Sequence, residues 1–212
     1  MTEPDVAFTD FLLAAECTLF VFLIFTYGKP SQPIRTWFTL FYLATGLSAL
    51  SGGIVHGFFL DELTFGYRFL WPATLLCIGL TAVSGWLIAG HLLLQRQKIR
   101  VLLIFVAVGY ALYSVMVIKY SQSFVTAIGF YVPAVLFMTI AFAYRFTRDH
   151  QPRIRDAVAG FLLSFVAAGI QQAKIGIHPR YFNHNALYHL LQAIALYLIY
   201  RGAVWFAAQD IK

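Results

Sequence analysis

Three histidines are the residues of this sequence whose type and placement best suit metal chemistry. His184 and His189 stand at the start of the last long apolar run, and His56 lies near the end of the second. Titratable side chains in apolar runs of this kind are costly to bury and usually serve a function. A catalytic zinc ion takes three protein ligands, often neutral imidazoles, and keeps one position open for water. We therefore expect His56, His184 and His189 to hold a zinc ion.

Two further side chains near His56 could take part in the chemistry. Zinc lowers the pKa of its bound water to about 7 and polarises a carbonyl group. Asp61 would orient that water or act as a general base, and Ser51 would assist the developing oxyanion. Ser51 has an alternative role, because it adjoins Gly52 and Gly53. Such a patch of small residues lets a neighbouring helix approach closely.

The spacing does not decide whether His184 or Asn185 acts together with His189 at the metal. Asn185 lies four positions before His189 and shares its helix face. His184 lies five positions before it, about 140° around an ideal helix. His184 therefore converges on His189 only if it stands at or before the helix start. Asn185 could instead cap the helix, since asparagine is a favoured N-cap residue. Glu16 lies about two turns into the first apolar run. It would stabilise the metal ligands from a position deeper in the membrane.

The composition indicates whether these residues lie in water or in a lipid bilayer. The chain has 212 residues, of which 60% are hydrophobic and only 11% are charged. A soluble domain carries about 25% charged residues, so we expect an integral membrane protein. The net charge of +6 lies in short loops and predicts topology rather than a nucleic-acid partner. Cys17 and Cys77 lie inside apolar runs, which favours inert buried thiols over a disulfide.

Seven segments are long and apolar enough to span a bilayer, which requires roughly 20 mostly apolar residues. They are residues 9–27, 35–59, 67–94, 101–119, 124–146, 156–174 and 185–206. The loops between them are too short to hold a soluble domain. We therefore predict an all-α fold, with one seven-helix transmembrane domain over residues 1–212.

The basic residues predict how the bundle is oriented, because cytoplasmic loops are enriched in Lys and Arg. With the N-terminus outside, eleven of the 15 Lys and Arg residues fall inside. These eleven are Lys29, Arg35, Arg96, Lys98, Arg100, Arg145, Arg148, Arg153, Arg155, Arg201 and Lys212. The other four are Arg68, Lys119, Lys174 and Arg180. The bias predicts an N-out, C-in topology, which places the three candidate ligands and Asp61 at the outer face.

This pattern resembles the CREST superfamily of seven-helix membrane hydrolases, which includes the alkaline ceramidases. The resemblance is carried by the seven spans, by His56 with Asp61 after it, and by residues 185–191 at the start of the seventh segment. It implies a zinc ion bound by three histidines, with Ser and Asp nearby, and cleavage of lipid amide bonds. By position, His56 and His189 correspond to zinc ligands, Asp61 to the Asp of the second segment and Glu16 to an acidic residue of the first.

The chain departs from the family pattern at two positions, which implies a divergent enzyme, one with altered metal ligation, or a relative that has lost activity. Asn185 stands where the family has the first histidine of its last pair, with His184 one residue earlier. Gly52 stands where the family has its serine, with Ser51 adjacent.

The predicted function is that of a zinc-dependent membrane hydrolase that cleaves an amide or ester bond of a lipid at the outer-leaflet side. Its substrate would enter laterally from the bilayer. One alternative is a non-enzymatic transporter, receptor or lipid-binding protein whose polar outer cluster includes Gln171, Gln172 and Lys174. Another is a structural partner subunit. A retinal pigment is disfavoured because the seventh segment has no lysine. The short loops favour a bacterial inner membrane over a eukaryotic internal one, and the sequence does not indicate an oligomeric state.

Overall fold

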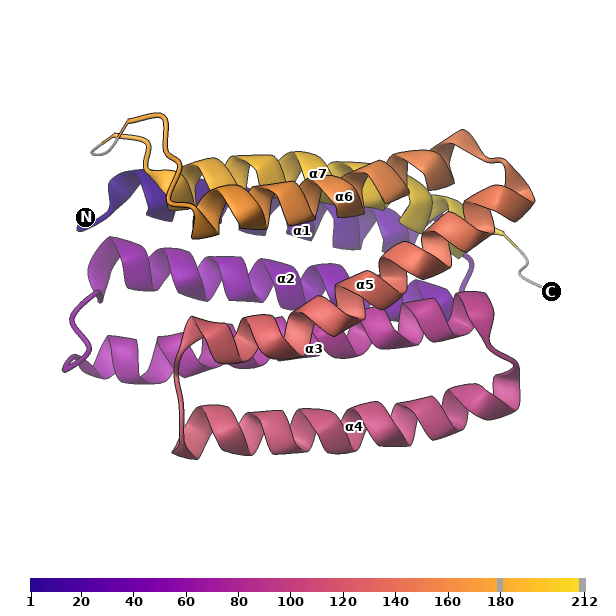
Figure 1. Ribbon diagram of the computed structural model, residues 1–212, viewed down its shortest axis with the longest axis horizontal. Helices are drawn as coiled ribbons and strands as arrows, with labels where there is room; N and C mark the ends of the chain where they lie inside the picture. Colours follow the sequence, from indigo (N-terminus) through magenta and orange to yellow (C-terminus); the bar gives the residue numbers. More distant parts are fainter. Residues whose placement is uncertain (179–180, 210–212) are drawn as a thin grey trace.

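The computed structural model describes residues 1–178 and 181–209, and seven long helices account for most of them (Figure 1). The helices are α1 (Pro4–Tyr27), α2 (Pro33–Phe58), α3 (Phe65–Leu93), α4 (Arg96–Lys119), α5 (Phe124–Asp149), α6 (Pro152–Gln172) and α7 (His184–Ala208). Each is long and apolar enough to cross a membrane. The predicted seven-helix membrane bundle is therefore confirmed. The helices extend beyond several predicted ends, most usefully at α1, which begins at Pro4 rather than residue 9.

Three helices begin with a proline, a residue that is well tolerated in the first turn of a helix. Pro4, Pro33 and Pro152 each occupy one of the first two positions of α1, α2 and α6. A proline is tolerated there because the first helical N–H groups have no partner within the helix. Pro72 and Pro133 lie inside α3 and α5, where neighbouring helices compensate for the lost hydrogen bond.

The bundle is packed around α1, α2 and α7, with α4 at its edge beside α3 (Figure 1). Phe20 of α1 stacks on Tyr200 of α7 at a centroid distance of 4.4 Å and meets Tyr42 of α2 edge-on at 5.3 Å. By contrast, α4 leaves Ile104 and Phe105 66% and 75% exposed. An apolar surface of this kind suits lipid, whereas the buried polar side chains of the described residues lie on α1, α3, α6 and α7.

The two ends of the bundle differ in what they carry. An odd number of helices puts the start of α1 and the end of α7 at opposite ends (Figure 1). The end at which α1 begins also holds the α2–α3 and α6–α7 loops and the first turn of α7, and we call it the N-terminal end. It corresponds to the predicted outer face, and the N-out orientation stays a prediction from the basic residues.

The contact between α6 and α7 depends on one glycine. A Cβ at Gly160 would lie 2.6 Å from the Ala195 carbonyl oxygen and 3.0 Å from the Ile199 amide nitrogen. Both atoms belong to the α7 backbone and cannot rotate away, so the two helices would have to separate. Interfaces of membrane helices use small residues for this reason.

We expect Gly160→Ala to lower the free energy of unfolding by about 1–3 kcal/mol, as overpacking does elsewhere. Gly169→Ala is a control in the same helix, because a Cβ there meets nothing within 4 Å. It should be neutral or slightly stabilising, since alanine favours the helix. Unfolding in mixed detergent micelles measures both variants, and equal stabilities would contradict the close α6–α7 contact.

Candidate functional site

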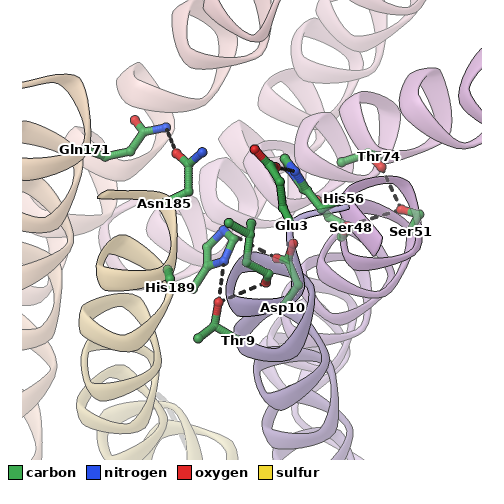
Figure 2. Close-up of polar contacts among 12 residues, drawn as sticks. Glu3, Thr9, Asp10, Ser48, Ser51, His56, Thr74, Gln171, Asn185 and His189 are labelled. Carbon is green, nitrogen blue, oxygen red and sulfur yellow. Dashed lines mark hydrogen bonds and ion pairs between the residues drawn. The ribbon is translucent and has the colours of Figure 1, made fainter. Parts of the chain in front are cut away.

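His189 lies in the first turns of α7 with its ring against α1 (Figure 2). Its Nδ1 is 3.1 Å from the Thr9 hydroxyl oxygen, and its Nε2 is 3.4 Å from Asp10 Oδ1. The His189 and Asp10 side chains are only 13% and 7% exposed. A carboxyl group and an imidazole are thus held together inside the bundle, where each would be costly without the other.

Two glycines of α2 give the Asp10 side chain its place. A Cβ at Gly53 would lie 2.9 Å from Asp10 Cβ, and one at Gly52 would lie 3.5 Å from Asp10 Oδ2. The absence of side chains at these positions lets α1 approach α2 with the carboxyl group between them. Asp10 therefore touches α2 on one side and His189 of α7 on the other.

His56 is held by a carboxylate at the beginning of the chain. Its Nδ1 lies 2.6 Å from Glu3 Oε2 (Figure 2). Hydrogen bonds with ionised partners are shorter and stronger than neutral ones. The backbone fixes Glu3 there, because the Thr2 N–H donates to the Gly57 carbonyl at 3.0 Å and the Glu3 N–H to the His56 carbonyl at 3.1 Å.

His56 lies near the end of α2 and His189 near the start of α7, so both belong to the N-terminal end of the bundle. His56 follows Gly52 by four positions and therefore shares the α2 face that meets Asp10. Asp10 and His189 thus meet between α1 and α7, and His56 lies on α2 at the same end of the bundle, paired with Glu3.

The geometry suits metal ligation in part. His56 contacts Glu3 through Nδ1, and His189 contacts Thr9 through Nδ1 and Asp10 through Nε2. A metal bound by His189 Nε2 would therefore replace its direct contact with Asp10. Two ligands of a tetrahedral zinc ion, each about 2.0–2.1 Å from the metal, lie about 3.3 Å apart. The 3.4 Å between His189 Nε2 and Asp10 Oδ1 matches that separation. In the described residues, no three His, Cys, Asp or Glu side chains are grouped closely enough to hold a metal. A third ligand from His56 would therefore require its side chain to turn.

His184, which the sequence predicts to bind the metal together with His189, lies beside the α6–α7 loop. His184 is the first residue of α7 and lines a shallow hollow with Lys174, Gly176 and Asn183. The structure therefore gives His184 a setting separate from the Asp10–His189 pair. The prediction of His184 as a metal ligand is not supported by this placement.

Asn183, one position before His184, caps α7. The Asn183 side-chain oxygen accepts hydrogen bonds from the Asn185 and Ala186 backbone N–H groups at 2.9 and 3.1 Å. The alternative in which Asn185 caps the helix is therefore wrong by two residues. Asn185 instead accepts a hydrogen bond from Gln171 Nε2 at 3.2 Å, which joins the start of α7 to the end of α6 (Figure 2).

The two predicted catalytic residues lie elsewhere on α2 and its loop. Asp61 is exposed, and its Oδ1 accepts the Leu63 N–H at 2.9 Å within the α2–α3 turn. Ser51 donates to the Leu47 carbonyl at 2.8 Å and accepts from the Thr74 hydroxyl of α3 at 2.9 Å (Figure 2). Asp61 shapes a turn and Ser51 faces α3, so their catalytic roles stay predictions.

Glu16 lies deeper in the bundle, on the same face of α1 as Thr9, seven residues earlier. Its Oε2 is buried and has no hydrogen-bond partner among the described residues. The hydroxyl of the buried Tyr42 of α2 donates to the Leu196 carbonyl of α7 at 3.0 Å. The carboxyl groups of Glu16 and Asp10 both belong to α1 and lie at different depths of the bundle.

Sequence reasoning missed Glu3, Thr9 and Asp10. The predicted first span began at Thr9, which left Glu3 before the membrane and placed Asp10 at the very edge of the span. Because α1 begins at Pro4, Asp10 lies almost two turns inside the helix.

The fold and the buried cluster define a seven-helix integral membrane protein with histidine and carboxyl side chains gathered at one end. The chain belongs to the family of unknown function DUF6962, whose model matches residues 6–207. The match contains Asp10, His56 and His189, while Glu3 lies before it. The comparisons with curated proteins and with solved structures return no match.

The Asp10–His189 contact predicts energetic coupling between α1 and α7. Asp10→Ala and His189→Ala should be non-additive by about 0.5–3 kcal/mol in a double-mutant cycle of unfolding, because the first replacement leaves the second group buried without its partner. Asp61→Ala paired with His189→Ala is the control, since Asp61 is exposed in a turn. Additive effects of Asp10→Ala and His189→Ala would show that the contact carries no coupling.

Proposed function

We propose that this protein is a zinc-dependent membrane hydrolase that cleaves an amide or ester bond of a lipid, with Asp10, His56 and His189 as the metal ligands. The observation that carries the proposal is the 3.4 Å contact of His189 Nε2 with Asp10 Oδ1, together with the protein contacts of both imidazoles through Nδ1. Relative to the prediction from sequence, Asp10 takes the place of His184.

The contacts behind the ligands support this assignment. Metal-binding histidines usually donate their other ring N–H to a carboxylate, a carbonyl or another oxygen, which fixes the tautomer and the ring orientation. Glu3 provides this contact for His56 at 2.6 Å. For His189 the Thr9 hydroxyl lies at 3.1 Å, and the Val6 carbonyl also lies beside the ring.

A zinc ion, when bound, would supply a water molecule of lowered pKa and an electrophile for the substrate carbonyl. The chain would provide the rest of the site. Glu3 and Thr9 hold the two imidazoles through Nδ1, and the α1–α2 contact keeps bulk water from Asp10. Asp61, exposed in the turn at the same end of the bundle, is the residue we assign to proton transfer at its carboxylate.

A lipid is the substrate class that the surroundings of the site favour. Phe8 and Leu12 of α1, on either side of Thr9 and Asp10 in the sequence, are 62% and 51% exposed. These two side chains lie on the face of α1 opposite Asp10. In a bilayer they contact acyl chains, so lipid adjoins the helix that carries the site. The short loops fit a bacterial inner membrane, with the site at the outer leaflet.

A second candidate is a proton-coupled transporter, and Glu16 favours it. Buried carboxyl groups of membrane helices often carry protons along a transport path. Glu16 has a buried oxygen without a partner and lies deeper on α1 than Asp10. This function requires no metal, so the zinc content separates the two candidates.

We expect the purified protein to contain about one zinc ion per chain by elemental analysis. Asp10→Ala, His56→Ala and His189→Ala should each remove it, and Glu3→Gln should weaken zinc binding 10- to 100-fold, as loss of a supporting carboxylate does. His184→Ala and Asp61→Asn are controls that should retain zinc. Zinc lost in His184→Ala but retained in Asp10→Ala would restore the three-histidine set.

Hydrolysis is tested separately with a fluorescent lipid amide and the matching ester. We expect cleavage by the zinc-loaded wild-type protein, loss of activity on chelation, and loss in His189→Ala. A zinc-free protein that transports protons, with transport abolished in Glu16→Gln, would replace the hydrolase with the transporter.

A further inference from the structure

A groove lies at the opposite end of the bundle from His189, between the end of α1 and the first turns of α2. It is lined by Phe25, Arg35, Thr36, Thr39, Leu40 and Leu43. Phe25 and Leu43 are 64% and 45% exposed, so the groove opens on the surface of the bundle that faces lipid. One cation and two hydroxyl groups are therefore combined with an apolar channel at the membrane surface.

Arg35 is positioned at the head of this groove by contacts with the end of α1. Its Nη2 donates to the Phe25 carbonyl at 2.6 Å, and the guanidinium carbon lies 4.3 Å from the centre of the Phe25 ring. A Cβ at Gly28 would lie 2.9 Å from Arg35 Cδ, so the glycine makes room for the arginine side chain. These contacts fix the cation instead of leaving it free in solvent.

The guanidinium has bonding capacity that the protein does not use. Arg35 Nε is buried and has no hydrogen-bond partner in the described part of the chain. A buried donor without an acceptor is costly. A guanidinium also matches the geometry of phosphate oxygens better than other side chains do. An anionic phosphate in the groove would pair with the Arg35 cation, and it would reach the Nε donor only if the side chain turned to expose it.

The shape of the groove continues from the polar head into the hydrocarbon region. Leu43 lies eight residues after Arg35, about 12 Å further along α2 at 1.5 Å per residue. The order of cation, hydroxyl groups and leucines follows that of a phospholipid, from phosphate through glycerol to acyl chain. Basic pockets between helices on the cytoplasmic side are typical sites for anionic head groups, and this end carries most of the predicted inner cations.

We propose that the α1–α2 groove binds one anionic phospholipid, with its phosphate at Arg35, its glycerol region beside Thr36 and Thr39, and an acyl chain along Leu40 and Leu43. This site is separate from the proposed zinc centre, since the two lie at opposite ends of the bundle. Either one can exist without the other.

The test is native mass spectrometry of the delipidated full-length protein titrated with phosphatidylglycerol or with phosphatidylcholine of the same acyl chains. We expect the wild-type protein to bind the first phosphatidylglycerol about fivefold more tightly than phosphatidylcholine, which is the effect of one cation near the surface. Arg35→Gln should bring the two affinities together. Arg100→Gln, an exposed arginine at the start of α4, should leave the preference unchanged.

Leu43→Trp provides a second variant that keeps the contact between Arg35 and α1. Because it fills the apolar part of the groove, it should weaken binding of both lipids severalfold while the protein stays folded. Equal affinities for the two lipids in the wild-type protein would overturn the proposal. An equal loss of preference in Arg100→Gln and Arg35→Gln would also overturn it, because it would show a diffuse charge effect instead of a groove.

Discussion

Burial of the Asp10 carboxyl group is the constraint on which the N-terminal end of the bundle depends. A carboxyl group inside a membrane helix is stable only with a partner. His189 provides that partner from α7, and Gly52 and Gly53 of α2 leave the space for it. The position of one side chain therefore requires three helices to meet within a few ångströms. The same requirement brings His56, one turn beyond Gly52, to the same end of the bundle.

Further hydrogen bonds fix the positions of the His189 and His56 rings at this end of the bundle. Thr9 and Glu3 engage the Nδ1 atoms of His189 and His56, and the first residues of the chain are hydrogen bonded to the end of α2. At the start of α7, the Asn183 N–H donates to Asp5 Oδ2 at 3.0 Å. The turns of α1 near the membrane surface thus connect α2 and α7. A metal site, a proton site or a purely structural cluster would all require this rigidity. The feature that favours a metal is the 3.4 Å separation of His189 Nε2 and Asp10 Oδ1, which two zinc ligands also have.

The opposite end of the bundle is organised by arginines. Arg201 of α7 lies 2.6 Å from Asp156 of α6, and Arg145 pairs with Asp149 one turn later on α5 at 2.7 Å. Each of these two arginines has a carboxylate partner within the protein. Arg35 differs from them, because its contacts are with a carbonyl and an aromatic ring and its Nε has no partner among the described residues. This difference, together with the groove beneath it, distinguishes a lipid site from a structural ion pair.

The sequence by itself determined that the chain forms seven membrane helices, because runs of about 20 apolar residues leave the backbone no other way to satisfy its hydrogen bonds in lipid. It also identified His56 and His189, since imidazoles in apolar runs stand out by type alone. Only the tertiary structure decided which groups accompany them. Asp10 lies in the sequence within an acidic terminus, and its role depends on where α1 begins and on which face meets α7. His184 is nearer to His189 in sequence than Asp10 is, yet the helix start turns it toward the α6–α7 loop. Contacts between helices depend on packing across the bundle, which the local pattern of one segment does not contain.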